Sequence, residues 1–118
     1  MTDRETQVRA LYHTVDRRDA PALAEFLTET VRFQLGNYDP IIGRDAVIDA
    51  NAGFFGTIQD MRHSLNGIWS VEETTICNGD VHYVRNDGST LTLPFATVLT
   101  FEDGRIADYQ VYVNVSPL

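Results

Sequence analysis

The sequence predicts an α+β protein that forms a single domain over its 118 residues, with three helices followed by an antiparallel sheet. In the first half, apolar residues recur at helical spacing. From His63 onward the pattern changes to strands that are separated by the turn dipeptides Asn78-Gly79, Asp87-Gly88 and Asp103-Gly104. Because short turns join neighbouring strands, we expect the second half to form an antiparallel meander.

Three segments of the first half are predicted to be helical. Residues 3–17 follow a capping box at Thr2-x-x-Glu5 and carry an apolar stripe. That stripe consists of Val8, Leu11, Tyr12 and Val15. A short helix begins at Asp19-Ala20-Pro21, with proline in the first turn, where its missing N–H is harmless. Residues 44–57 form the third helix, with its apolar face around Val47, Ile48, Asn51, Phe54 and Phe55.

The predicted sheet has one short strand before the third helix and four longer strands after it. Residues 31–35 alternate between apolar and polar side chains and end at Gly36-Asn37, which is a turn signal. The four strands of the meander cover residues 63–76, 81–87, 90–101 and 105–115.

The composition excludes several classes of partner. The formal net charge is −8, and all nine basic residues are arginines, so no basic surface for nucleic acid or an anionic membrane is expected. No apolar run approaches the roughly 18 residues of a membrane span. The polar N-terminus carries no secretory signal, which predicts a cytoplasmic protein.

The sequence gives no support for a disulfide, a metal site or a cofactor. Cys77 is the single cysteine and is interpreted as a packed thiol. The three histidines, His13, His63 and His82, are scattered and have no metal-ligand spacing.

An Arg-x-Asp pair near the end of one predicted strand is the strongest candidate for chemistry. Arg85 and Asp87 are two residues apart, so on a strand they point to the same face. A charge on an apolar face needs a partner, so we expect a direct ion pair at the wall of a small pocket. The alternative is that Asp87, which precedes Gly88, is an ordinary turn former.

Several local motifs resemble the nuclear-transport-factor-2-like superfamily, and most closely its SnoaL-like group and the limonene epoxide hydrolases. They are Gly43-Arg44-Asp45-Ala46-Val47, Arg85-x-Asp87-Gly88, Leu93-Pro94 and Tyr112-Val113-Asn114-Val115-Ser116-Pro117-Leu118. The resemblance covers nearly the whole chain. It implies a cone in which a strongly curved antiparallel sheet wraps three N-terminal helices around a deep apolar pocket.

The resemblance also suggests roles for single residues. Arg85 and Asp87 match the Arg-x-Asp pair of the epoxide hydrolases, but Asn114 stands where those enzymes have their base Asp. An amide is no base near neutral pH. Phe33 and Leu35 occupy the positions that hold the water in those enzymes. Epoxide hydrolysis is therefore not expected. The related ketosteroid isomerases have a base Asp on the first strand, where this chain has Phe33, so that chemistry is not expected either.

Three functions remain open at this point. The first is an enzyme of the SnoaL-like cyclase, isomerase or lyase type that binds a small, mostly apolar molecule, with Asp87 as acid–base group, Arg85 as its partner, and Asn114 holding a substrate oxygen. The second is a binding protein without chemistry, and the third is a dimeric interaction domain. The expected ligand-binding residues are Tyr12, Phe33, Leu35, Phe54, His63, Trp69 and Tyr112. His63 is either a pocket acid or base, as in scytalone-dehydratase-like relatives, or a satisfied core histidine.

Self-association is predicted from the last strand. Val111, Val113 and Val115 alternate with polar residues, and such an apolar face is rarely left in water. We expect this face to form the outer side of the sheet and to pack against a second copy in a homodimer.

Overall fold

The computed structural model describes residues 3–118 and confirms the α+β fold. Two α-helices, α1 (Asp3–Asp16) and α2 (Arg44–Phe55), and a 3₁₀ helix, η1 (Pro21–Phe26), match the predicted helices closely. Thr2 of the predicted capping box lies outside the described residues. The strands are β1 (Leu27–Leu35), β2 (Ile41–Ile42), β3 (Ile58–Val71), β4 (Thr74–Arg85), β5 (Thr90–Glu102) and β6 (Arg105–Tyr112).

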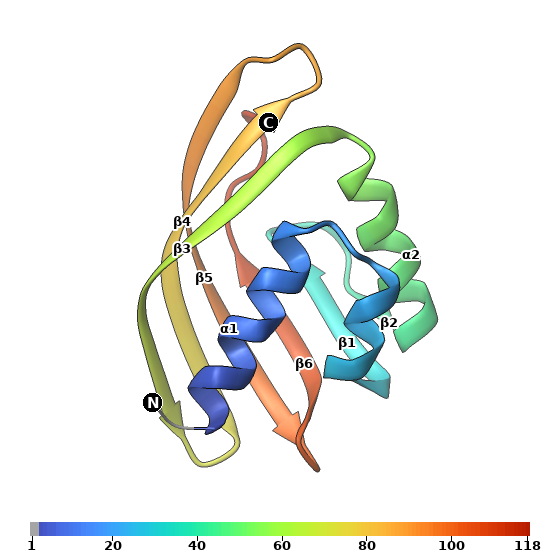
Figure 1. Cartoon of the computed structure of the whole chain (residues 1–118). Helices are drawn as coiled ribbons and strands as arrows, with labels where there is room; N and C mark the ends of the chain where they lie inside the picture. The colour runs from blue at the N-terminus through green and yellow to red at the C-terminus, as the bar shows by residue number, and fades with distance from the viewer. Residues whose placement is uncertain (1–2) are drawn as a thin grey trace.

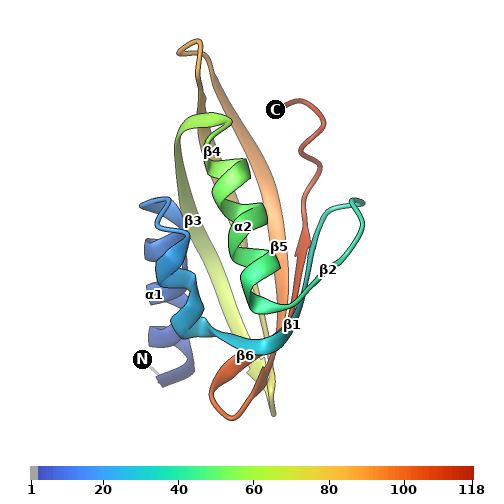
Figure 2. The same cartoon turned by 90° about the vertical axis from the view of Figure 1, so that its right-hand side faces the viewer.

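The six strands form one strongly curved, unclosed sheet in the order β2-β1-β6-β5-β4-β3. All neighbours are antiparallel except β1 and β6, which run parallel, with Phe33 opposite Tyr109. The sheet curls around α1 and α2, which lie on its concave side (Figures 1 and 2). The short strand β2 was not predicted, because two residues carry no periodicity.

One predicted turn is wrong. Asn78-Gly79 lies in the middle of β4, and the β3–β4 turn is formed by Glu72 and Glu73, where Glu72 has φ 56°. Glycine is needed at position 79 for close packing: a Cβ there would lie 1.8 Å from the carbonyl oxygen of Ser64. The neighbouring strand has a β-bulge between Leu65 and Gly67, and bulges bring backbones together in this way.

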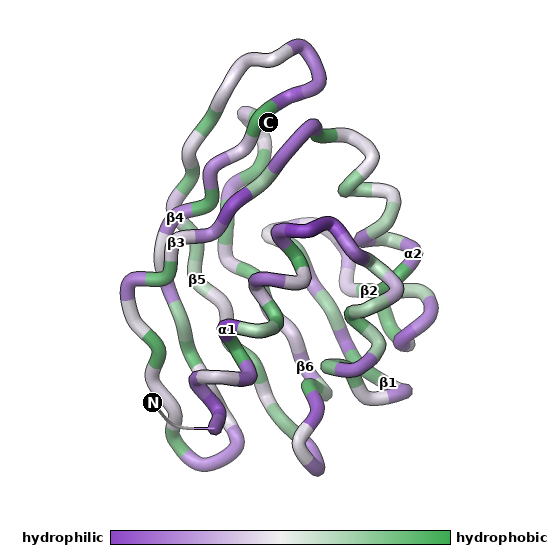
Figure 3. Tube along the Cα trace, viewed as in Figure 1, coloured by the Kyte–Doolittle hydropathy of each residue, from purple (hydrophilic) through white to green (hydrophobic). Residues whose placement is uncertain are grey.

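The core lies between the helices and the concave face of the sheet. The predicted stripe of α1 is buried, including Val8 and Leu11, and α1 packs against β3. Figure 3 shows a strongly hydrophilic segment directly after α1, where the chain turns toward η1. No helix within residues 3–118 is long and apolar enough to span a membrane.

The predicted orientation of the last strand is also wrong. Val111 and Val113 line the interior, so the valine face points into the cone and not toward a second copy. The opposite face carries Tyr112, whose side chain is 57% exposed. Exposed apolar side chains on the long strands β3 and β4 are Trp69, Val71 and Ile76. Self-association stays a prediction, and its expected surface moves to this outer face.

Candidate functional site

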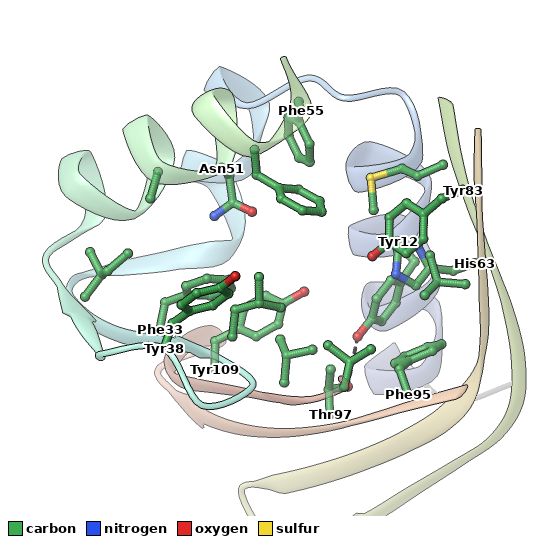
Figure 4. Close-up of a pocket in the computed structure, with 18 of the residues that line it drawn as sticks. Tyr12, Phe33, Tyr38, Asn51, Phe55, His63, Tyr83, Phe95, Thr97 and Tyr109 are labelled. Carbon is green, nitrogen blue, oxygen red and sulfur yellow. Dashed lines mark hydrogen bonds between the residues drawn. The ribbon is translucent and has the colours of Figure 1, made fainter. Parts of the chain in front are cut away.

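A cavity of about 200 Å³ lies between α1, α2 and the sheet. Its wall is mostly aromatic, with rings from both helices and from five strands (Figure 4). These rings belong to Tyr12, Phe33, Phe54, Phe55, His63, Tyr83, Phe95 and Tyr109. Leu35, Met61, Val81, Val111 and Val113 add aliphatic surface. The arrangement favours an apolar, flat ligand.

A histidine–carboxylate pair lies at one wall. The Nδ1 of His63 donates to Asp16 Oδ1 at 2.6 Å, and the backbone N–H of His63 donates to Asp16 Oδ2 at 2.9 Å. The His63 side chain is 8% exposed and that of Asp16 21%. Because the carboxylate holds the proton on Nδ1, Nε2 is the nitrogen that can accept or release a proton. Nε2 has no hydrogen-bond partner among residues 3–118, and the ring lines the cavity.

The end of α1 is built to hold this pair. Asp16 is the last residue of the helix, where the helix dipole disfavours an anion. Arg18 then adopts φ 55° and turns the chain, and its guanidinium donates to Asp60 Oδ1 of β3 at 2.7 Å. This ion pair fastens the end of α1 to β3, two elements that carry Asp16 and His63. An aspartate kept at an unfavourable helix end, with two bonds to one histidine, is typical of a functional position.

Tyr12 joins α1 to the floor of the cavity. Its ring centroid lies 4.7 Å from that of His63. Its hydroxyl lies 2.9 Å from Thr97 Oγ1, and the thiol of Cys77 donates to the same hydroxyl at 3.7 Å. Burial raises the pKa of Tyr12 well above its usual value, and burial also raises the pKa of Cys77. Both groups therefore stay neutral, and Cys77 is a packed thiol, as predicted.

Two further tyrosines place hydroxyl groups at the cavity wall. Burial raises the pKa of Tyr83 to about 12, and the charge of Asp16 adds to this effect. Burial likewise raises the pKa of Tyr109. Neutral phenols can donate a hydrogen bond to a ligand oxygen. Figure 4 shows Tyr83 beside His63, so a donor and a proton-transfer group lie next to each other.

Five of the seven predicted ligand-binding residues line the cavity: Tyr12, Phe33, Leu35, Phe54 and His63. The other two lie elsewhere. Trp69 is 57% exposed and covers Gly67, and Tyr112 points outward from β6. Both lie on the outer face because the actual strand register turns them away from the cone.

Arg85 and Asp87 do not form the expected ion pair, which is absent from the contacts of residues 3–118. Strand β4 ends at Arg85, and Asp87 closes the β4–β5 turn by accepting from the backbone N–H and Oγ of Ser89, at 2.9 and 2.6 Å. Arg85 donates to Ser89 Oγ and to the carbonyl oxygens of Thr90 and Pro117. The hydrogen bonds from Ser89 lower the pKa of the exposed Asp87.

The hairpin that carries this pair extends beyond the end of α2, next to the C-terminus (Figure 2). Arg85 and Asp87 line a separate, open depression that shares only Leu35, Tyr38 and Phe54 with the cavity. Asn114 also lies outside the cavity, where its Oδ1 accepts from the backbone N–H of Ser116 at 3.1 Å. The three predicted catalytic residues are therefore turn and surface residues in this structure.

Several residues of the site were not predicted from the sequence. Asp16 had one available signal, an acidic residue at a helix C-terminus, but its partner lies 47 residues away. Thr97 and Tyr109 gave no signal beyond strand alternation. Within residues 3–118, no three histidine, cysteine or acidic side chains are grouped to hold a metal ion.

The family can be assigned from comparison with known proteins. The chain matches the SnoaL-like domain over residues 8–109, whereas no curated protein matches it. An NTF2-like protein of unknown function from Burkholderia pseudomallei is 23% identical, with a TM-score of 0.88 over 99% of this chain and 95% of that chain. A candidate polyketide cyclase from Xanthomonas campestris pv. campestris is 24% identical, with a TM-score of 0.82 over 96% and 91% of the two chains.

A third structure is a hypothetical protein with a ketosteroid isomerase-like fold from Catenulispora acidiphila, in complex with trimethylamine. It is 14% identical, with a TM-score of 0.84 over 93% of this chain and 86% of that chain. At these identities, the structures show the shared fold. Together with the match over residues 8–109, they place this chain in the SnoaL-like domain family, within the nuclear-transport-factor-2-like fold.

Proposed function

We propose that this protein binds a small, mostly apolar carbonyl compound in the cavity and moves a proton on it with His63. The observation that carries this proposal is His63 at the wall of an apolar cavity, with its Nδ1 bonded to Asp16. Histidine is the most common general acid–base group, and a carboxylate on Nδ1 orients the ring and stabilises its charged form. The reaction belongs to the isomerase, lyase or cyclase type.

The size of the cavity limits the ligand. Its volume of about 200 Å³ is below the roughly 300–1,000 Å³ of sites for drug-sized molecules. It exceeds the about 150 Å³ of an engineered apolar cavity that binds benzene. We therefore expect one substituted ring, with the flat face against the aromatic wall.

The proton step needs only groups at this wall. Nε2 of His63 takes a proton from the carbon next to the ligand carbonyl, and the electron pair of that C–H bond forms an enolate. The neutral hydroxyl of Tyr83, held protonated by burial, donates to the enolate oxygen. The same imidazolium then returns a proton to a carbon of the enolate, so protons and electrons balance without a cofactor.

Hydrogen–deuterium exchange tests this step without knowledge of the natural substrate. In D₂O, the methyl protons of 4-methylacetophenone next to its carbonyl should exchange faster with the protein than without it, as followed by proton NMR. His63→Gln should reduce the acceleration by roughly a hundredfold or more. His82→Gln is the matched control, because His82 bonds Thr92 outside the cavity. Equal acceleration by wild type and His63→Gln would contradict the proposal.

A binding protein without chemistry is the competing function. Such a protein would use the same apolar cavity. Calorimetry would then show that 4-methylacetophenone binds both to wild type and to His63→Gln. Binding without any acceleration of exchange would favour this function over the enzyme.

A further inference from the structure

One carboxamide interrupts the apolar lining that α2 contributes to the cavity. Asn51 lies there beside Phe54 and Phe55. Its Nδ2 donates to the backbone carbonyl of Val47, one turn earlier, at 2.9 Å. This bond holds the amide nitrogen against the helix and leaves Oδ1 as an acceptor. Oδ1 has no hydrogen-bond partner among residues 3–118, and Figure 4 shows it turned toward the cavity interior.

The fold does not need a polar group at this position. The backbone carbonyl of Val47 lies inside α2 and receives its hydrogen bond from the helix itself. Asn is a weaker helix former than Leu, which would also extend the apolar wall. Asn51 Oδ1 is accessible from the cavity and is not sealed in the core, so its hydrogen bond must come from water or from a ligand. A ligand that carries a donor would supply this bond directly.

The polar groups of the proposed proton step lie across the cavity from Asn51, whereas Tyr38 and Asp39, which also line the cavity, belong to the loop between β1 and β2. Figure 4 shows His63, Tyr83 and Tyr12 on the α1 side and Asn51 on the α2 side. The neutral hydroxyl of Tyr83 is a donor, so that side suits a carbonyl oxygen. The cavity thus offers a donor at one end and an acceptor at the other, with aromatic rings between them.

We infer that Asn51 is a specificity-determining residue that selects a ring carrying a hydroxyl or N–H group at the end opposite its carbonyl. This inference rests on the proposed function, because it uses the same cavity and the same carbonyl end. The ligand class is a hydroxyaryl carbonyl compound or a cyclic analogue with the same donor and acceptor ends. An unsubstituted apolar ketone binds in this cavity but leaves Asn51 Oδ1 without a partner.

A pair of probes of nearly equal size isolates this contact. In 4-hydroxyacetophenone a hydroxyl takes the place of the ring methyl of 4-methylacetophenone. Isothermal titration calorimetry of wild type should give roughly two- to tenfold tighter binding of the hydroxyl compound, the range of a net hydrogen bond. Asn51→Leu should remove this preference and retain the methyl compound. Asn51→Asp keeps an acceptor and should retain the preference.

Control variants distinguish a failure of the inference about Asn51 from a failure of the proposed function. Asn66→Leu, at an exposed position of β3, should leave the preference unchanged. Thermal melting of each variant shows whether it is folded. If both probes bind wild type without preference, or if the preference survives Asn51→Leu, the inference about Asn51 is wrong while the proposed function stands. If neither probe binds wild type, the proposed function fails and the inference fails with it.

Discussion

Two pairs of an acidic and a basic side chain, Asp16–His63 and Asp87–Arg85, are candidates for acid–base chemistry. They differ in their hydrogen bonds and in their distance from the cavity. Asp16 and His63 come from α1 and β3 and share two hydrogen bonds, and His63 lines the cavity. Asp87 and Arg85 are two residues apart, yet each bonds other groups at an exposed turn. Arg85 and Asp87 share a hairpin because they are close in sequence, whereas Asp16 and His63 meet because α1 packs on β3.

The backbone of β4 next to β3 and the backbone of the β4–β5 hairpin should differ in how well they tolerate a side chain. This comparison gives the largest expected effect on stability. Gly79 packs against the backbone of β3, and Ala there would push its Cβ into the carbonyl of Ser64. We expect Gly79→Ala to destabilise the fold by about 3 kcal/mol. Gly88→Ala in the hairpin has open space and should cost about 1 kcal/mol, because φ is +88°.

Urea denaturation of both variants measures this difference. Equal losses in the two variants would contradict the close packing of β4 against the bulge of β3, and with it the tight placement of His63.

Self-association tests whether the hairpin takes part in an interface between two copies of the chain. We predict that self-association uses the outer face of the sheet and leaves the hairpin out. Trp69→Glu and Ile76→Glu, both at exposed apolar positions, should then weaken a dimer, since a stable interface buries roughly 1,200 Å² or more. Sedimentation velocity at micromolar concentration measures the mass. A wild-type monomer would contradict the dimer, and a dimer unaffected by either variant would contradict the surface.

The smallest expected effect concerns the hairpin itself. The Ser89 hydrogen bonds lower the pKa of Asp87, so the folded state gains stability above the pKa of unfolded Asp, and this gain is lost as pH falls through the lower, folded value. Ser89→Ala should move the pKa of Asp87 upward, toward its usual value. Carbon-13 NMR of the carboxyl group detects the titration. An unchanged titration would mean that Ser89 does not set it.

Much of the fold follows from local signals in the sequence. The stripe of α1 and the apolar face of α2 gave correct helices, and Asp103-Gly104 gave a correct turn between β5 and β6. Asn78-Gly79 misled because the same dipeptide that favours a turn also suits close approach of two strands. The choice between them depends on the β3 bulge, which has no local signal in the sequence.

Less of the site than of the fold could be predicted from the sequence, because the site depends on strand ends and on packing that leave no local signal. A spacing of two places side chains on one face only while the strand continues, and β4 ends at Arg85. His63 was recognised as a candidate from its position at the start of a strand pattern. Its partner Asp16 could be identified only once α1 was packed against β3, because the fold alone brings residues 47 apart into contact.

The most direct test of the account compares two carboxylate-to-amide changes, Asp16→Asn and Asp87→Asn, in the exchange reaction of 4-methylacetophenone. Asn at position 16 no longer presents a carboxylate that holds the His63 ring and its Nδ1 proton in place, so we predict a loss of at least about tenfold in the protein-dependent rate. Asp87→Asn should leave the rate within about twofold of wild type, the range of a surface change. A rate that falls with Asp87→Asn and is retained with Asp16→Asn would show that the chemistry lies at the hairpin and would contradict the central claim.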